Sequence, residues 1–402
     1  MTGTGLFLLC KDAGLSLRLD KLGVVIALLV AYGTLVAPFA TFRANRIVPG
    51  EAKSILAALP VGAGVVLLGL MVVAAAIILL KTPALLRLAA AAVSLGAIAL
   101  FIGLTATYLT PPENTYARVS PASGFWVLLF AYALLAADSI TRLRPRPGIR
   151  VLLLLSTLAG ATAILVSGLW DGLSILKEYA GRADVFWLEA GRHVALALGS
   201  LFASVVVGLP LGILCHRVEP LRAGVLNTLN LIQTIPSIAL FGILIAPLGW
   251  IAVNVPGAAA IGIRGIGAAP AFVALFLYSL LPVVANTVVG LAGVPREANE
   301  AARGIGMTDR QRLFGIELPL AMPVILTGIR IVLVQNIGLA TIAALIGGGG
   351  FGVFVFQGIG QTAMDLVLLG AVPTVVLAFA AAIVLDALIE MNTPSQNRGR
   401  TA

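Results

Sequence analysis

Residues 300–319 read EAARGIGMTDRQRLFGIELP, a polar stretch between two long apolar segments. Small apolar side chains recur just before and within it at the spacing of one helix face, at Ala298, Ala301, Ala302 and Ile305. Gly306 is the residue type that ends a helix in the left-handed conformation, and Thr308 with Gln311 has the pattern of a capping box. Pro319 predicts a stop or a kink before the next apolar segment. The stretch therefore predicts a helix–turn–helix whose alanine stripe permits close approach of another surface.

The composition of the 402-residue chain is that of a membrane protein. Hydrophobic residues make up 60% of it and charged residues 11%, unlike a soluble domain of this size. Apolar runs of helix-spanning length recur along the chain. They predict an all-α polytopic membrane protein rather than a β-barrel, which would show short alternating segments. The net charge of +9 does not indicate nucleic-acid binding, because the cations lie in short loops.

The apolar runs predict about ten transmembrane helices. They lie near residues 22–41, 61–80, 88–110, 123–140, 151–169, 192–214, 225–248, 269–293, 320–346 and 366–389. Alternate loops hold 17 and 7 lysines and arginines, and the richer set is expected to face the cytoplasm. Both termini and the segment 295–319 are then cytoplasmic, and membrane lipid surrounds the spans.

The chain divides into four predicted parts. Residues 1–170 form a five-helix membrane region without a recognisable motif. Residues 171–191 have the mixed charged and aromatic pattern of an amphipathic linker on the extracytoplasmic side. Residues 192–390 hold the other five spans and every informative stretch, and residues 391–402 form a cytoplasmic tail.

No metal or catalytic site is predicted. The cysteines Cys10 and Cys215 and the histidines His193 and His216 have no partners at metal-ligand spacing. No Ser/His/Asp or paired-carboxylate arrangement is found either, so the chain is not expected to be an enzyme.

The polar stretch also has the spacing of a known motif. The matching residues are Glu300, Ala301, Ala302, Gly306, Ile316, Leu318 and Pro319. Through them the chain resembles, over about residues 190–390, the permease subunits of binding-protein-dependent ABC importers, which share the EAA motif and the type I importer core. The resemblance implies that segment 295–319 is the coupling helix, which sits in a groove of a cytoplasmic ATPase subunit and transmits its closure.

The flanking stretches narrow this resemblance. QTIPSIALFGILI (233–245), ALFLYSLLPVVANTVVGL (274–291) and NIGLATIAALIGGGGFGVFVFQGI (336–359) resemble the permeases for glycine betaine, choline and carnitine. The long first half is similar to one branch of that group, and the shorter permeases lack it. The resemblance implies a bacterial inner-membrane location, an extracytoplasmic substrate-binding protein and a second permease subunit, identical or paralogous.

The chain lacks a loop for ATP. A phosphate loop reads Gly-x-x-x-x-Gly-Lys-Ser/Thr, but none of the five lysines follows a glycine. ATP and Mg²⁺ are therefore expected on the partner ATPase, with no cofactor in this chain. The stretch IGGGGFG (346–352) falls on the predicted outer face and indicates a tight turn or a re-entrant link between the last two spans.

Two alternatives remain at this point: an ABC permease for another small polar solute, and an ion-coupled secondary transporter. The latter class usually holds ionisable groups near the membrane midplane. Arg330 is the one such candidate, and an interhelical tie is its simpler interpretation. Arg330, Pro236 and Ser237 are the candidate residues for a translocation path or gate.

Overall fold

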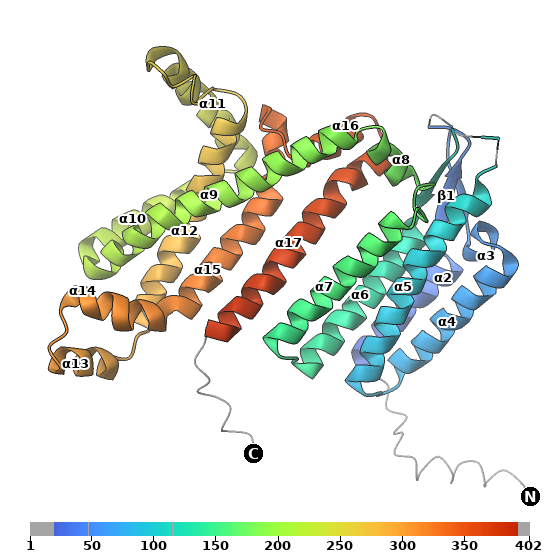
Figure 1. Ribbon diagram of the computed structural model, residues 1–402, viewed down its shortest axis with the longest axis horizontal. Coiled ribbons are helices and arrows are strands. Elements are labelled where there is room, and N and C mark those ends of the chain that lie inside the picture. The colour runs from blue at the N-terminus through green and yellow to red at the C-terminus, as the bar shows by residue number, and fades with distance from the viewer. Residues whose placement is uncertain (1–19, 47, 112, 115, 393–402) are drawn as a thin grey trace, which may run out of the picture. The chain divides into compact units, whose positions relative to one another are not determined.

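The computed structural model describes residues 20–46, 48–111, 113–114 and 116–392, which are mostly helical (Figure 1). Cys10 and the predicted tail beyond residue 392 lie outside these residues. The chain forms two compact units. Unit 1 comprises residues up to 146 together with 156–180, and unit 2 comprises 147–155 together with 181 onward.

Among the described residues, nine helices are long and apolar enough to cross a membrane. They are α4 (Val61–Leu79), α5 (Ala84–Leu109), α6 (Ser123–Leu143), α7 (Pro147–Val166), α9 (Ala183–Arg217), α11 (Ser237–Asn254), α12 (Ala268–Ala292), the run Asp309–Leu339 that contains α15 (Leu318–Leu339), and α17 (Met364–Asn392). The helix α2 (Lys21–Leu35) is apolar but shorter than a usual span, with 15 residues. The predicted polytopic, helical fold is confirmed.

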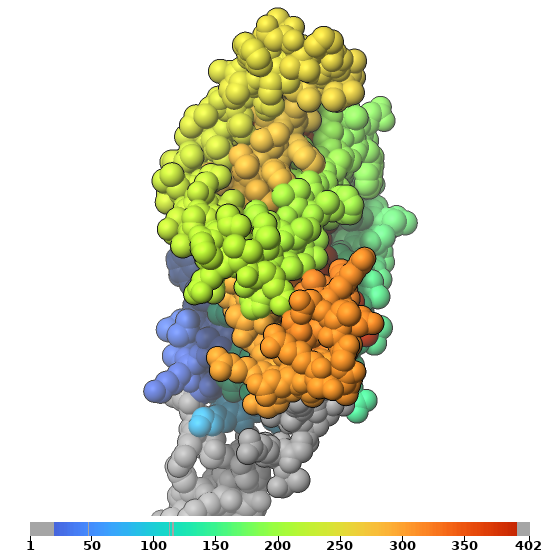
Figure 2. Space-filling model, turned by 90° about the vertical axis from the view of Figure 1, so that its left-hand side faces the viewer, coloured from blue at the N-terminus to red at the C-terminus, as the bar shows by residue number. Residues whose placement is uncertain are grey.

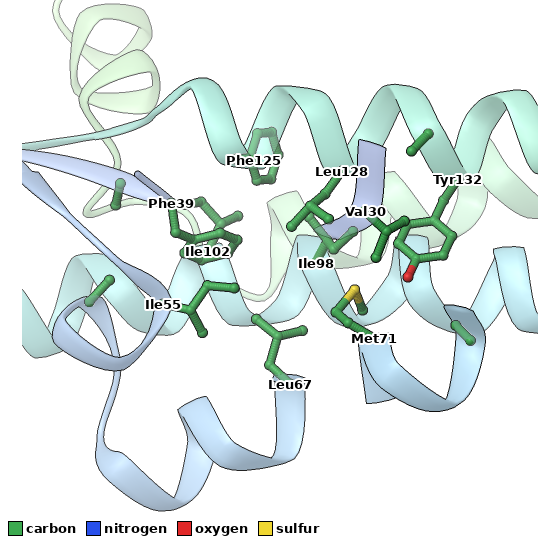
Figure 3. Close-up of a cluster of buried hydrophobic side chains, with 14 of the residues drawn as sticks. Val30, Phe39, Ile55, Leu67, Met71, Ile98, Ile102, Phe125, Leu128 and Tyr132 are labelled. Carbon is green, nitrogen blue, oxygen red and sulfur yellow. The ribbon is translucent and has the colours of Figure 1, made fainter. Parts of the chain in front are cut away.

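Unit 1 is a helical bundle with its own apolar core. The core side chains come from α2, α4, α5 and α6 and from the short helix α3 (Ile55–Ala58). Figure 3 shows Met71, Ile98 and Tyr132 from three of these helices meeting in that core. Gly124 permits a close approach here, since a Cβ on it would lie 2.8 Å from the carbonyl oxygens of Gly33 and Ala37. The helix α8 (Ser174–Ala180) completes the unit.

A small antiparallel sheet also belongs to unit 1, and the sequence did not predict it. Its strands are β1 (Ala40–Arg43), β2 (Glu51–Lys53) and β3 (Arg118–Pro121), in the order β2-β1-β3. Strands of three or four residues within polar loops are too short to produce a period-two pattern that can be recognised. The sheet joins the loops that follow α2 and precede α6.

Unit 2 is built around α12, which packs against α9 on one side and α15 on the other. Glycines on α9 make the first contact close. A Cβ at Gly208 would lie 2.9 Å from Val283, and one at Gly212 would lie 2.6 Å from Thr287. Membrane helices pack in this way because small residues let their backbones approach.

Two predicted boundaries in this half are wrong. The segment 171–191 is no separate linker, because α8 belongs to unit 1 and the span helix α9 already begins at Ala183. The predicted span 225–248 is two helices, α10 (Glu219–Thr234) and α11. The break falls before Pro236, which disfavours helical geometry at Ile235. A prediction from average hydropathy over 225–248 does not register this proline, because the residues around it are apolar.

The remaining elements of unit 2 are short. They are α13 (Arg296–Gly304), α14 (Asp309–Arg312), the π-turn η1 (Leu313–Glu317), the 3₁₀ turn η2 (Ile342–Ile346) and α16 (Gly352–Gly360). The predicted ninth span 320–346 therefore ends earlier, at Leu339, and its last residues form η2.

Candidate functional site

The polar stretch folds locally as predicted. The helix α13 ends before Gly306, which has a φ of 83° and so adopts the left-handed conformation. The Thr308 side chain accepts a hydrogen bond from the Gln311 backbone N–H, and the Gln311 side chain accepts one from the Thr308 backbone. Both halves of the capping box are therefore present at the start of α14.

The segment from α13 to η1, which we call the coupling segment, presents a mixed surface. Of the predicted alanine stripe, Ala302 is buried, whereas Ala301 and Ile305 are exposed. The side chain of Ile305 is 80% exposed and that of Phe314 is 61% exposed. Large exposed apolar side chains on a polar segment are candidates for contact with a partner protein.

A buried carboxylate anchors the coupling segment, and the sequence analysis did not identify it. Glu317 accepts a hydrogen bond from the Arg217 side chain at 2.5 Å and another from Arg312 Nε at 3.0 Å. Arg312 also pairs with Asp309 at 2.8 Å. Glu317 and Arg312 are each 3% exposed. Figure 2 shows the orange coupling segment beside the yellow-green end of α9, which carries Arg217.

The motif residues after Gly306 lead directly into the span. Ile316 is half-buried in the π-turn, Leu318 is buried at the start of α15, and Pro319 is exposed. The π-turn lies immediately before the proline, whose missing N–H leaves the carbonyl four residues earlier without its helical partner. The wider π-turn accommodates the missing hydrogen bond, so the helical run continues through Pro319 into α15. Glu300 is exposed on α13.

The candidate gate residues Pro236 and Ser237 lie at the break between α10 and α11. Tyr278 of α12 donates its hydroxyl to the Ile235 carbonyl, and Gln233 donates to the Tyr278 carbonyl at 2.8 Å. These two hydrogen bonds hold the break against α12. Pro236 is exposed and Ser237 is half-buried.

Arg330 does not join those two residues. It forms an ion pair with Asp386 of α17, and both side chains are partly exposed. This pair connects α15 with α17, which is the interhelical tie that the sequence offered as the simpler interpretation. A second ion pair, Arg150 with Glu390, connects the start of α7 with α17 inside unit 2.

A polar cluster lies in the interior of unit 2. Asn336 donates to the hydroxyls of Ser200 and Ser279, each at 2.9 Å, and all three residues are fully buried. The cluster joins α15 to α9 and α12. Interhelical hydrogen bonds of this kind are a recurrent means of fixing helix packing in membranes.

The glycine-rich stretch 346–352 is a tight turn, as predicted, and it is held by α9. Glu189 accepts from the Gly350 N–H at 2.6 Å and pairs with Arg192, while His193 Nδ1 accepts from the Phe351 N–H at 3.3 Å. Gly349 and Gly350 have φ values of 77° and 88°. This turn borders a cavity of about 710 Å³, whose lining includes Arg192, Phe272, Ile263 and Gly347.

Within the described ranges, no cluster of three or more His, Cys, Asp or Glu side chains could hold a metal ion. The polar clusters found above instead link helices or anchor the coupling segment. Their geometry is suited to positioning helices relative to one another, as a transport subunit requires.

Comparisons with known proteins agree over both halves of the chain. Residues 208–397 match the model of the family "binding-protein-dependent transport system inner membrane component", and residues 20–176 match "ABC transporter permease YehY, N-terminal domain". The osmoprotectant import permease protein OsmW of Salmonella typhimurium is 45% identical over 219 residues, 54% of this chain and 94% of that protein. The glycine betaine/carnitine/choline transport system permease protein OpuCB of Bacillus subtilis is 35% identical, over 52% of this chain and 90% of that protein.

A solved structure of the MetNI methionine ABC transporter in inward-facing conformations is also similar. It matches 53% of this chain and 96% of its own, with 23% sequence identity and a TM-score of 0.45.

The fold and these matches define a class, the membrane-spanning permeases. Within it, the chain belongs to the family of binding-protein-dependent transport system inner membrane components. It is a permease subunit of an ABC transporter, a multi-pass inner-membrane protein with an additional N-terminal domain.

Proposed function

We propose that this subunit imports a quaternary ammonium osmoprotectant such as glycine betaine. Support comes from the similar permeases, whose names specify osmoprotectants, glycine betaine, carnitine and choline. A quaternary ammonium cation is best recognised by a cage of aromatic rings. Among the residues that the structure describes, Phe272 is the one aromatic side chain that lines the 710 Å³ cavity. Selectivity among solutes is therefore assigned to a separate extracytoplasmic binding protein that delivers the solute.

The energy comes from a partner ATPase, which holds ATP and Mg²⁺ and docks on the coupling segment. The observation that carries this proposal is the anchored but exposed geometry of that segment. Ile305 and Phe314 are available to a partner, while Glu317 ties the same segment to α9 and α15. The motif residues from Glu300 to Pro319 then have the coupling role that their spacing predicts.

The solute path is formed between two permease subunits, identical or paralogous. Pro236 and Ser237 are its candidate gate residues, because broken helices place backbone polar groups at solute sites in many transporters. Arg330 is assigned to the α15–α17 tie through Asp386, where it positions a helix of the path.

Solute uptake tests this function directly. The test uses cells that have no other transporter for glycine betaine and that express this chain with its co-purifying partners. These cells should accumulate radiolabelled glycine betaine. Uptake should stop when ATP is depleted and survive collapse of the proton and sodium gradients. Uptake that follows an ion gradient without ATP would instead identify a secondary transporter. ATP-dependent uptake of another polar solute, without uptake of glycine betaine, would leave the assignment as an ABC permease intact and show that the proposed substrate is wrong.

Purification in mild detergent tests the coupling role separately. The full chain should co-purify with an ABC ATPase, and Phe314→Asp should release that ATPase while the permease remains folded. Leu345→Asp is a matched control, since Leu345 is also exposed but lies in η2 outside the coupling segment. Equal ATPase recovery with both variants would contradict docking on this segment.

The proposed orientation places both termini and the coupling segment in the cytoplasm. Single cysteines at positions 146 and 308 should react with a membrane-impermeant maleimide only after the cells are opened. A cysteine at position 259, which is exposed, should react in intact cells. Reaction of position 308 in intact cells would reverse the orientation and remove the docking surface from the ATPase.

Residues 1–170 are assigned a peripheral role, outside the solute path. A chain that begins near residue 145 should still assemble with the ATPase and transport. It keeps the start of α7, whose Arg150 pairs with Glu390. A chain that begins near residue 170 lacks that pair and should retain less activity. Assembly of both shortened chains without any transport would place the first half in the path itself.

A further inference from the structure

Cations from two loops and from the helix α8 gather at the sheet of unit 1. Arg43 lies on β1, Arg118 lies on β3, and Arg46 follows β1. Lys177 of α8 reaches the same place, where its Nζ donates to the Ala117 carbonyl at 2.9 Å. All four belong to the set of loops that is poorer in basic residues. Topology signals therefore do not explain this gathering.

Two of these cations face each other directly. Arg43 and Arg118 are cross-strand partners in the register of β1 and β3. Side chains of such partners lie on the same face of the sheet with their Cβ atoms about 5 Å apart, and like charges in this arrangement are destabilising. Nothing in the sheet requires an arginine at either position for packing, since the buried side chain of β3 is Val119 on the other face.

Acidic side chains balance this pair only in part. Glu178, which is buried, approaches Arg118 at 3.9 Å and Arg46 at 3.7 Å. Arg43 Nε and Arg118 Nη1 are buried and have no hydrogen-bond partner among the described residues. Glu51 pairs instead with Lys53 and lies opposite Phe42 in the register. Burial and the charge of Arg118 lower the pKa of Lys177, as expected for a lysine held among other cations.

We propose that Arg43, Arg118 and Lys177 form a binding site for a phosphate group. Buried guanidinium N–H groups that make no hydrogen bond are donors that a phosphate oxygen satisfies, and the arginine fork fits phosphate oxygens in a bidentate manner. A phosphate also supplies the negative charge that offsets the repulsion between the facing arginines. The buried nitrogen atoms favour a compact oxyanion over a broad acidic protein surface.

Two sources of the phosphate group fit this chemistry. One is free phosphate, and the other is the headgroup of an anionic phospholipid. The sheet directly follows the apolar helix α2 and precedes the span α6, so it lies at the level of headgroups if those helices cross the bilayer. Neither source depends on the proposed solute or on the ATPase.

The test uses the full chain, purified in a neutral detergent, and its thermal unfolding midpoint. Sodium phosphate should raise the midpoint by about 3 °C over sodium chloride of the same ionic strength. The double variant Arg43→Gln/Arg118→Gln should lose that rise. Without phosphate, it should unfold near the wild-type temperature, because the relief of the like-charge pair offsets the loss of the Arg118–Glu178 contact at 3.9 Å. A purely structural role for these arginines would lower the midpoint instead.

A control variant and a lipid experiment complete the test. Lys53→Gln changes a cation of the same sheet that already has a partner, so it should keep the full phosphate response. If free phosphate has no effect, nanodiscs with phosphatidylglycerol should raise the midpoint over phosphatidylcholine nanodiscs in the wild type but not in the double variant. That result identifies the lipid as the source. Equal responses of wild type and double variant to both probes overturn the proposal, as does a double variant that unfolds earlier without phosphate.

Discussion

Arg217, the last residue of α9, donates a hydrogen bond to Glu317 across 2.5 Å, although the two residues are 100 positions apart. Glu317 also accepts from Arg312 of α14. One carboxylate therefore joins the end of a span, the coupling segment and the start of the next span. Any force on the coupling segment reaches both spans through this group.

Replacement of this carboxylate should weaken the fold and the coupling together. Glu317→Gln leaves Arg217 without its anion and leaves Arg312 with Asp309 alone, and the loss of one partner of a buried pair typically costs roughly 3–5 kcal/mol. The cost should be smaller here, since the Arg217 side chain is 35% exposed. Thermal unfolding and ATPase co-purification measure the two effects. Asp309→Asn is the matched control, because that carboxylate is 87% exposed and should matter little. Equal effects of the two variants would contradict the anchoring role.

Gly306 is predicted to be required because its backbone is left-handed, and not because a side chain would lack room. A Cβ there would meet no atom within 4 Å, but the φ of 83° disfavours other residues. Gly306→Val should cost more than the roughly 1–2 kcal/mol typical of a left-handed residue, since valine is β-branched. The turn would reorganise, and transport should be lost while membrane insertion persists. Gly304→Ala, which has equal space and no positive φ, should remain active. Undiminished solute uptake by the valine variant would exclude the turn from coupling.

Gly352 is predicted to be required for space. A Cβ on it would lie 1.8 Å from the Thr341 carbonyl oxygen, so Gly352→Ala must displace the turn between α15 and α16. Such overpacking costs roughly 1–3 kcal/mol, and the unfolding midpoint should fall. Gly360→Ala, at the end of the same helix, meets nothing within 4 Å and should leave the midpoint unchanged. Indistinguishable midpoints would show that the turn accommodates a methyl group.

Asp20 is predicted to make the stability of unit 1 depend on pH. Burial acts to raise its pKa, but hydrogen bonds and charges from Arg87 and Arg142 outweigh this effect and hold it below the usual value. A lowered pKa contributes stability that is complete above the unfolded-state value of about 3.9 and is lost as pH falls through the folded-state value. Asp20→Asn should therefore lower the unfolding midpoint at pH 7.

The difference between wild type and this variant should then begin to shrink below about pH 4, where Asp20 takes up a proton in the unfolded chain, and should close as the pH falls through the lowered folded-state pKa. Asp171→Asn changes an exposed carboxylate of the same unit and should leave the pH profile unchanged. A gap between wild type and Asp20→Asn that stays constant down to pH 2 would contradict the assigned ion pairs.

Features encoded within a few residues could be predicted from the sequence. The capping box of Thr308 and Gln311 and the left-handed Gly306 depend on neighbours three or four positions away, so their patterns are visible in the chain. The spans were predicted for the same reason, since each depends on its own hydropathy. The error at 225–248 arose where a single proline outweighs an apolar window.

Features that depend on distant partners could not be predicted. In the sequence Glu317 has the pattern of an ordinary loop carboxylate, and only the fold shows that it pairs with Arg217 of α9. Glu189 and Gly350 are 161 positions apart, and no local pattern relates them. Asn336 is likewise one polar residue in an apolar run, and only the packing of three helices shows its two serine partners. The facing arginines of the small sheet became apparent only with its register.

The π-turn before Pro319 gives the permease a mechanical advantage. The turn preserves the helical run from Asp309, and α15 continues it for 22 residues, about 33 Å at 1.5 Å per residue. A tilt of α15 by about 5° at its base displaces its far end by about 3 Å. A break in the helix at the proline would let the coupling segment and α15 turn separately. A small displacement at the coupling segment is therefore transmitted into α15 and is largest at its far end.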